Sequence, residues 1–307
     1  MKRIADFDVY PLCLGGNVFG WTADEEQSFA VLDAYAEAGG NFIDTADVYS
    51  AWAGKGGESE TIIGRWMAAR GNRDQMIIAT KVGMLSGLQT LTPDTIRKAA
   101  EDSLRRLGTD RIDLYYAHID DQSTPLHQTL EGFTALVKAG KVRHLGASNF
   151  TAARLTEALD LADREGFARY AALQPHYNLV DRAKYEGELA ETVAAQGLSC
   201  VPFFGLARGF LTGKYRPEST DNASPRSAKA REYLDERGLT VLEALDAVAA
   251  QHQSTPGAVA LAWLAAQPTV AAPIASARNV VQLNEILSMA TLALTDADLA
   301  RLAAASA

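Results

Sequence analysis

The sequence predicts an α/β protein, a single (β/α)8 TIM barrel with an N-terminal hairpin before it and extra helices at its C-terminal end. About eight short apolar stretches alternate with segments of helix length. Short apolar strands of this kind need cover on both faces, which is typical of a parallel sheet. Eight such units in about 300 residues favour a closed barrel over an open sheet. Because the composition shows no break, we expect one domain over residues 1–307.

The expected elements follow from apolar spacing and from residues that start or stop a helix. The first helix is marked by Phe29, Leu32 and Ala36 and stopped by Gly39, and another helix starts at the cap Thr92. A polar, irregular stretch is expected at 214–237. The expected strands are 12–14, 42–44, 76–80, 112–117, 143–147, 170–174, 198–203 and 270–274. The expected helices are 24–38, 58–69, one from 92, 126–138, 151–165, 186–196, 240–251, one from 255, 279–288 and 296–304.

The composition argues against several classes of partner. The formal net charge is −9 at pH 7, whereas a nucleic-acid-binding surface needs clustered Lys and Arg. No apolar run approaches the roughly 18 to 20 residues that span a bilayer. Asp6 and Asp8 interrupt any apolar segment at the N-terminus, so we expect no secretory signal. Cys13 and Cys200 lie far apart in apolar stretches, and we expect buried thiols in a cytoplasmic protein.

Four chemically capable side chains lie at or just beyond the ends of consecutive predicted strands. Asp44 ends the second strand, Tyr49 lies in the loop after it, Lys81 follows the third strand and His118 the fourth. Active sites of (β/α)8 barrels lie at these strand ends. An ammonium group lowers the pKa of a nearby Tyr, an Asp holds that ammonium, and an imidazole orients a carbonyl oxygen. Each residue alone is ordinary, but together they suit proton exchange with an alkoxide.

Two nucleotide-binding motifs and a metal site are not supported. Gly15, Asn17 and Gly20 fail at the second glycine of a dinucleotide fingerprint, and the stretch 209–214 is one residue short of a Walker loop. The stretch from His118 to His127 matches no metal-ligand spacing, so we expect no metal.

Spacing alone leaves open a glycosidase pair among the carboxylates. Asp44, Asp113 and Asp120 are the candidates for such a pair. That interpretation gives Lys81 and Tyr49 no task.

Four motifs, in order along almost the full chain, resemble those of the aldo-keto reductase family. They are DTADVYS with GESE at 44–60, LRRLGTDRIDLY at 104–115 leading to His118, GKVRHLGASNF at 140–150 and LTGK at 211–214. The resemblance implies a barrel that binds NADPH, less often NADH, across its strand ends. It also implies reduction of a small-molecule aldehyde or ketone, with no nucleic-acid or membrane partner.

By position, the resemblance assigns a role to each site residue. Tyr49 would be the general acid, Asp44 and Lys81 would tune its pKa, and His118 would orient the substrate carbonyl. Arg278 would receive a 2′-phosphate, which favours NADPH. Ser148, Asn149 and Gln174 would bind the nicotinamide amide, with Phe203 stacked on its ring. The other implied cofactor contacts are Gly16, Asn17, Leu206, Arg208, Ser276, Gln282 and Glu285.

Several points stay open at this level. Phe19, Trp21 and Trp52 either line the substrate pocket or pack the loops above it. The segment 216–237 is either a lid over the cofactor or a surface excursion. The physiological substrate and the oligomeric state are not readable. An alternative function is a catalytically silent, NADPH-binding regulatory subunit like the potassium-channel β-subunits of this family, although the complete set of four residues argues against it.

Overall fold

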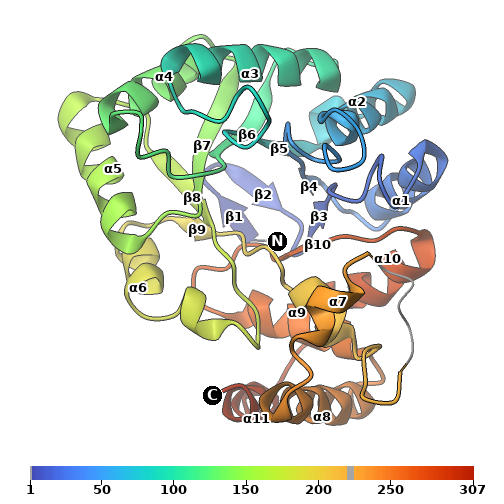
Figure 1. Cartoon of the computed structure of the whole chain (residues 1–307). Coiled ribbons are helices and arrows are strands. Elements are labelled where there is room, and N and C mark those ends of the chain that lie inside the picture. Colours follow the sequence, from blue (N-terminus) through green and yellow to red (C-terminus); the bar gives the residue numbers. More distant parts are fainter. Residues whose placement is uncertain (1, 220–224) are drawn as a thin grey trace.

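The computed structural model describes residues 2–219 and 225–307, which contain an eight-stranded parallel sheet curled into a barrel (Figure 1). Its strands pair in the order β10-β3-β4-β5-β6-β7-β8-β9. The chain before β10 closes the ring, because the Cys200 N–H donates to the Thr269 carbonyl at 2.8 Å and the Cys13 N–H donates to the Pro273 carbonyl at 3.0 Å. The predicted (β/α)8 barrel is confirmed. The strands are β3 (Cys13–Gly15), β4 (Phe42–Asp44), β5 (Ile77–Val82), β6 (Ile112–Ala117), β7 (Val142–Ser148), β8 (Tyr170–Gln174), β9 (Ser199–Cys200) and β10 (Ile274–Ala275).

Two strands are much shorter than predicted. Strand β9 ends at Cys200 and β10 begins only at Ile274, whereas the apolar runs extend over 198–203 and 270–274. The reason is that Pro202 and Pro273 lack the N–H group that a regular ladder requires. The chain still lies alongside its neighbours there, and the Ile274 N–H donates to the Pro202 carbonyl at 2.9 Å.

Helices follow the strands and cover the outside of the barrel (Figure 1). Many begin at side-chain caps, such as Thr92, which accepts from the Thr95 N–H with Pro93 at the first helical position. The barrel helices are α1 (Glu25–Glu37), α2 (Glu58–Arg70), α3 (Pro93–Leu107), α4 (Leu126–Lys138), α5 (Ala152–Glu165), α6 (Glu188–Ala195), α9 (Pro256–Ala266) and α10 (Val280–Leu287). Short 3-10 turns are η1 (Arg73–Gln75), η2 (Arg182–Lys184), η3 (Ala207–Thr212) and η4 (Ser288–Ala290).

Three further helices lie outside this ring. Helix α8 (Glu236–Gln251) packs against α9 and against α11 (Asp296–Ala305), which confirms the extra C-terminal helices. The stretch 214–237, predicted as irregular, contains the short helix α7 (Ser227–Arg231) and the start of α8. A five-residue helix is too short for apolar periodicity to reveal. The earlier start of α8 comes from Asp235, whose side chain accepts from the Gly238 N–H at 2.7 Å.

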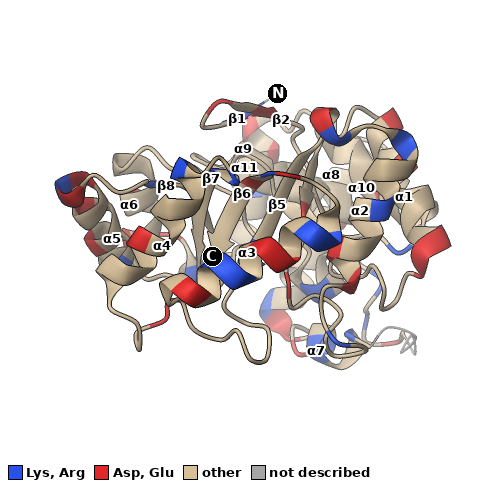
Figure 2. Ribbon diagram, turned by 90° about the horizontal axis from the view of Figure 1, so that it is seen from above, with Lys and Arg blue, Asp and Glu red and all other residues tan. Residues whose placement is uncertain are grey.

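The N-terminal hairpin closes one end of the barrel. Strands β1 (Lys2–Ile4) and β2 (Phe7–Val9) pair antiparallel, as predicted, and Ile4, Phe7 and Val9 are buried in one cluster with barrel residues such as Phe42 and Leu114. Figure 2 shows the hairpin and α7 at opposite ends of the barrel. The hairpin therefore covers the N-terminal end of the strands and leaves the C-terminal end open.

Two smaller features of the chain complete the fold. Cys13 and Cys200 are free and buried, as expected. Within residues 2–219 and 225–307, no helix has both the length and the apolar character required to cross a membrane.

Candidate active site

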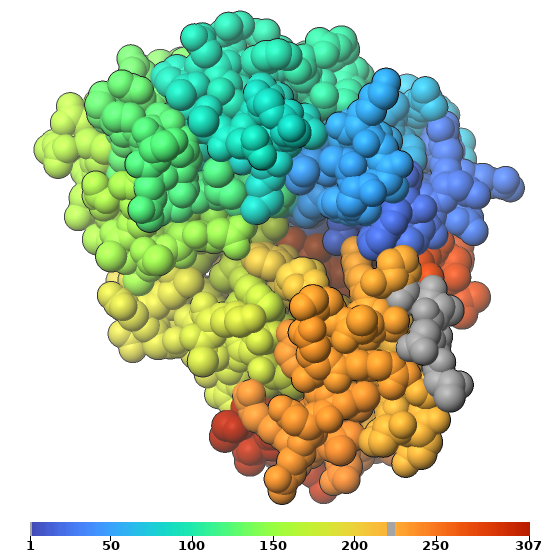
Figure 3. Space-filling view, in the orientation of Figure 1, coloured from blue at the N-terminus to red at the C-terminus, as the bar shows by residue number. Residues whose placement is uncertain are grey.

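A cleft of about 1380 Å³ lies at the C-terminal ends of the strands. Figure 3 shows the hollow between the N-terminal loops, the central part of the chain and the α7 region. Ligand pockets for one small molecule usually have volumes of about 300–1,000 Å³, so this cleft has room for a larger ligand together with a small one. Tyr49 and His118 line one part of it, and Arg278 and Gln282 line another.

Tyr49, Lys81 and Asp44 form one hydrogen-bonded group at the bottom of the cleft. Lys81 Nζ donates to Asp44 Oδ2 at 2.6 Å and lies 2.9 Å from Tyr49 Oη, while Tyr49 Oη lies 3.2 Å from the same Asp44 oxygen. A third donor bond of Lys81 goes to the Thr45 carbonyl at 2.7 Å. Lys81 and Asp44 are buried, so their charges face each other with little water between them. This geometry holds the phenol in one position beside a cation.

Burial dominates the protonation of this group. Burial first, and then the Asp44 carboxylate, raise the pKa of Tyr49 well above its usual value. Burial lowers the pKa of Lys81, and Asp44 opposes that shift. The expectation that Lys81 lowers the pKa of Tyr49 is therefore not met, because burial and the Asp44 carboxylate outweigh the effect of the ammonium. Tyr49 keeps its proton at neutral pH, which is the state that a proton donor needs.

His118 stands beside Tyr49 as a neutral imidazole. The two rings lie edge to face, with centroids 6.2 Å apart. Burial, and then the Lys81 charge, lower the pKa of His118 well below its usual value. Its Nδ1 is buried and has no hydrogen-bond partner within the described residues. A neutral imidazole carries a single N–H, which suits it to contact a carbonyl oxygen.

The polar residues after β7 and β8 are tied to the catalytic group. Gln174 Nε2 donates to Asp44 Oδ1 at 2.8 Å, and Ser148 Oγ donates to the Gln174 main-chain carbonyl at 2.9 Å. Asn149 Nδ2 donates to the His118 carbonyl at 2.8 Å. Both Asp44 oxygens are thus occupied. Within the described part of the chain, the side-chain carbonyl oxygens of Gln174 and Asn149 accept no hydrogen bond, which leaves them as acceptors for a ligand amide.

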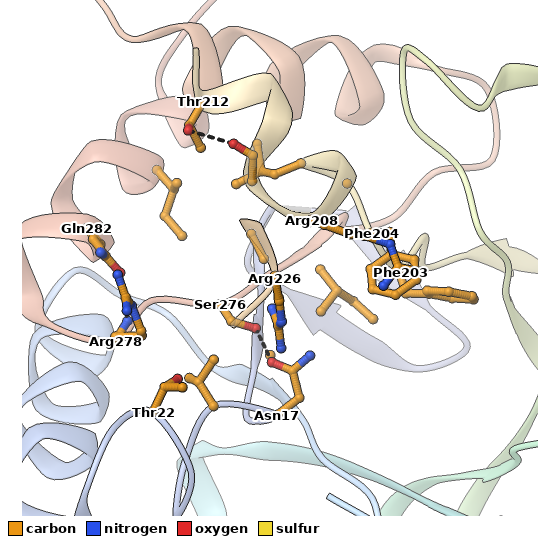
Figure 4. Close-up of a pocket in the computed structure, with 18 of the residues that line it drawn as sticks. Asn17, Thr22, Phe203, Phe204, Arg208, Thr212, Arg226, Ser276, Arg278 and Gln282 are labelled. Atoms are coloured by element: carbon orange, nitrogen blue, oxygen red, sulfur yellow. Dashed lines mark hydrogen bonds between the residues drawn. The ribbon is translucent and has the colours of Figure 1, made fainter. Parts of the chain in front are cut away.

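The other part of the cleft is lined by cations. Arg208, Lys214, Arg226 and Arg278 line it, with Glu285 as the one carboxylate at that end among the described residues. Burial, and then Arg208, lower the pKa of Arg226, and Arg278 adds to that shift. Figure 4 shows Arg208, Arg226 and Arg278 around the hydrogen bond from Ser276 Oγ to Asn17 Oδ1, which measures 2.8 Å. Mutually repelling cations on a protein of net charge −9 form a local site for an anion.

The segment that carries Arg208 has strained backbone. Phe204, Ala207 and Arg208 have φ values of 56°, 46° and 60°, in the left-handed region that non-glycine residues rarely adopt. The Arg208 guanidinium lies 4.2 Å from the centre of the Phe204 ring. Strain of this kind is concentrated at ligand sites and persists only where surrounding packing holds it.

The structure brings most of the sequence-predicted residues to this cleft. Lys81 lies behind Tyr49 rather than on the cleft wall, and Gly16 faces away, with its N–H donating to the Asp44 carbonyl at 2.7 Å. Gly15 lines the cleft in its place. The predicted residues that line the cleft are Asn17, Asp44, Tyr49, His118, Ser148, Asn149, Gln174, Phe203, Leu206, Arg208, Ser276, Arg278, Gln282 and Glu285.

The open points of the sequence are partly settled. Trp21 and Trp52 line the cleft, whereas Phe19 is buried beneath the loops. Asp113 and Asp120 do not line it, since they pair with Arg73 at 2.8 Å and with Arg154 at 2.8 Å, so no glycosidase pair forms.

The predicted lid and one missed residue lie in the same segment. Part of the segment 216–237, residues 220–224, lies outside the described residues. Arg226, which follows them, lines the cleft. Sequence reasoning missed this residue, and the only signal for it was the polar segment itself.

Comparisons with known proteins agree with the geometry. The model of the aldo/keto reductase family matches residues 11–307. The chain is 34% identical to the uncharacterized oxidoreductase YrpG of Bacillus subtilis (strain 168), over 92% of this chain and 88% of that protein. It is 33% identical to norsolorinic acid reductase stcV of Emericella nidulans, over 97% and 79%. It is 32% identical to Protein tas of Escherichia coli (strain K12), over 98% and 95%.

Proposed function

We propose, because the chain belongs to the aldo/keto reductase family, that it reduces an aldehyde or ketone to an alcohol with NADPH as hydride donor and Tyr49 as proton donor. Membership makes the chain an oxidoreductase that acts on small carbonyl compounds, in a family that generally uses NAD(P)H. The observation that supports the finer part is the hydrogen-bonded group of Tyr49, Lys81 and Asp44 at the bottom of the cleft. We propose that residues 1–307 work as one domain.

The residues of the cleft fit a phosphorylated dinucleotide. Arg208, Lys214, Arg226 and Arg278 supply positive charge where the phosphates would lie. The first turn of α10 adds the backbone N–H groups of Val280 and Val281, which have no acceptor within the helix, whereas the Gln282 N–H donates to Asn279 Oδ1 at 2.9 Å. At the other end, the side-chain acceptor oxygens of Gln174 and Asn149 suit a carboxamide. A planar guanidinium is well matched to a phosphate dianion, so we favour NADPH over NADH.

The chain's own residues supply the proton and orient the substrate. When bound, the nicotinamide supplies the hydride that goes to the carbonyl carbon. Tyr49 Oη donates its proton to the carbonyl oxygen as negative charge develops there. Lys81 Nζ, 2.9 Å from that hydroxyl, stabilises the phenolate that remains, and Asp44 keeps the ammonium in place. The neutral His118 ring contacts the carbonyl oxygen and fixes its direction.

Cofactor binding is the first test. Trp21 and Trp52 line the cleft, so intrinsic fluorescence reports on its occupation. We expect saturable quenching by NADPH, and weaker quenching by NADH. Absence of binding to either nucleotide would overturn the proposal.

The second test removes the proton donor. Tyr49→Phe should lower the turnover of a carbonyl substrate by about 10²–10⁴-fold, with little change in the Kd for NADPH. The matched control is Tyr10→Phe, because Tyr10 packs on Tyr35, away from the cleft. Undiminished turnover in Tyr49→Phe would refute the assigned role. Stable NADPH binding without turnover of any carbonyl by the unmodified protein would instead favour a regulatory subunit.

A further inference from the structure

Three rings pack on one another at the Phe203 end of the cleft. The ring of His176 lies 5.4 Å from the Phe203 ring and 5.1 Å from the Phe204 ring, centre to centre, and those two rings lie 5.0 Å apart. Phe203 and Phe204 line the cleft (Figure 4), whereas His176 does not. The main chains are joined as well, because the Phe203 N–H donates to the Pro175 carbonyl at 2.9 Å. The position of the Phe203 ring therefore depends on what holds His176.

His176 is held at both of its ring nitrogens. Its Nε2 lies 2.8 Å from Asp181 Oδ2, and its Nδ1 lies 3.2 Å from Lys184 Nζ. An ammonium group can only donate, so Nδ1 accepts from Lys184. Nε2 then carries the ring proton and donates to the Asp181 carboxylate, which can only accept. These two contacts fix the tautomer and the orientation of the ring.

Asp181 joins this histidine to the segment between α7 and α8. Its Oδ2 also accepts from Tyr233 Oη at 2.7 Å and from Asn178 Nδ2 at 3.2 Å, and its Oδ1 lies 3.1 Å from Lys184 Nζ. Burial alone would raise the pKa of Asp181, but the hydrogen bonds from His176, Tyr233 and Lys184 outweigh it and hold that pKa well below its usual value. Asp181 therefore stays a charged acceptor at neutral pH.

The chain that carries the Phe203 ring needs such support. Phe204 and Arg208 lie in the left-handed region, with φ values of 56° and 60°. Backbone strain of this kind persists only where the surroundings hold it. Asn178 Nδ2, which contacts Asp181, also donates to the Phe204 carbonyl at 3.0 Å. The group around Asp181 thus contacts both the packed rings and the strained main chain.

We propose that Asp181 is a positioning residue for hydride transfer. It acts through His176, which holds the Phe203 ring at the place where the nicotinamide would lie. This inference rests on the proposed reduction with NADPH, in which Phe203 would stack on the nicotinamide. Asp181 does not itself line the cleft. Its loss should therefore disturb the nicotinamide end and spare the phosphate end, where Arg278 lies.

The test compares Asp181→Asn, His176→Phe and the double variant with the unmodified protein. His176→Phe keeps an aromatic ring but removes both nitrogens. Glu186→Gln is the matched control, because Glu186 accepts from the Tyr177 hydroxyl at 2.7 Å in the same part of the chain and does not line the cleft. Lys184→Ala removes the other contact of His176 from a half-exposed side chain, and it carries the test if Asp181→Asn does not fold.

Three quantities are measured for each protein. The Kd for adenosine 2′,5′-bisphosphate, which lacks a nicotinamide, reports on the phosphate end of the cleft. The emission of bound NADPH reports on the surroundings of its dihydronicotinamide ring. The single-turnover rate of NADPH oxidation by 4-nitrobenzaldehyde reports on hydride transfer. A purely structural loss would not separate the two ends of the cleft.

We expect Asp181→Asn and His176→Phe to lower the single-turnover rate by roughly 10–100-fold, because a misplacement of about 1 Å can cost about 10²-fold. Both variants should shift the emission of bound NADPH, and Lys184→Ala should shift it in the same direction. The Kd for the bisphosphate should stay within about twofold, the usual error of such comparisons. The double variant should match His176→Phe, since Asp181 acts through this ring. Glu186→Gln should match the unmodified protein.

Three results would each overturn this inference alone. They are an unchanged rate and emission in Asp181→Asn, effects that multiply in the double variant, and a loss of bisphosphate binding equal to the loss of NADPH binding. Failure of the unmodified protein to bind NADPH would overturn the proposed function as well. If the unmodified protein binds NADPH without reducing the aldehyde, the emission and the Kd for the bisphosphate still decide this inference.

Discussion

Asp47, two residues before Tyr49 in the same loop, should make the stability of the protein depend on pH. Its carboxyl group is fully buried, and neither oxygen has a hydrogen-bond partner within the described residues. Burial first, and then the nearby Glu60 carboxylate, raise the pKa of Asp47 from 3.8 to about 8. The folded protein therefore binds this proton more tightly than the unfolded chain. The resulting stability is fully present below about pH 4 and is lost as the pH rises through about 8.

The magnitude follows from the two pKa values. Between them the free energy of unfolding falls by about 1.4 kcal/mol per pH unit because of this group, and therefore by about 2.5 kcal/mol from pH 5 to pH 7. Asp47→Asn keeps the shape of the protonated acid and cannot titrate, so it serves as the reference.

The assay is chemical unfolding of both proteins at several pH values. We expect the stability of the unmodified protein, relative to Asp47→Asn, to decline by that amount between pH 5 and pH 7. A difference between the two proteins that stays constant to within about 0.5 kcal/mol, a typical precision for such comparisons, would refute the reasoning.

Three further predictions concern the cofactor, the acid–base groups and the packing. Arg278→Ala should weaken NADPH binding by roughly 10–100-fold, which is the cost of a charge-assisted contact, and should weaken NADH binding far less. Equal losses in the two titrations would contradict a contact between Arg278 and the 2′-phosphate. The pKa of His118 lies well below its usual value and the pKa of Tyr49 lies well above its usual value. The value of kcat/KM for reduction should therefore stay constant from about pH 6 to pH 8. A decrease of kcat/KM on the acidic side near pH 6.5 would contradict this. Gly64→Ala should destabilise the protein by about 1–3 kcal/mol in chemical unfolding, because the new Cβ would lie 2.7 Å from the Leu107 main-chain carbon of α3. This clash outweighs the preference of Ala for a helix.

The parts of the fold that sequence predicts well are those set by local pattern. Strands β4 and β6 have the predicted bounds, because turn residues or charged side chains flank each short apolar run. The four strand-end residues are predictable for the same reason, since a barrel brings the ends of consecutive parallel strands to one rim. No long-range information is needed to place Asp44, Lys81 and His118 there.

The rest of the site depends on features that local pattern does not carry. Gly15 ends β3 and lines the cleft, whereas Gly16 is the first residue after the strand and its N–H turns to the Asp44 carbonyl at 2.7 Å. Arg226 reaches the cleft only because its segment packs back over the barrel, and no periodicity marks that path. The pKa of Tyr49 depends first on its burial and then on the nearby Asp44 carboxylate, and both are set by tertiary packing.

Backbone strain is the third feature that sequence does not reveal, and Asn149 allows it to be measured. Asn149 has a φ of 60° and donates from Nδ2 to the His118 carbonyl at 2.8 Å, so its conformation fixes the main chain beside the imidazole. Asn149→Ala and Asn149→Gly both remove that hydrogen bond, but only Ala suffers the left-handed penalty of about 1–2 kcal/mol. Gly loses part of this advantage, about 0.5–1 kcal/mol, through the greater freedom of its unfolded chain. We therefore expect Asn149→Gly to be more stable than Asn149→Ala by about 0.5–1 kcal/mol in chemical unfolding. Equal stability would mean that the main chain of the Ala variant relaxes out of the left-handed region, which would contradict the strain assigned to this position.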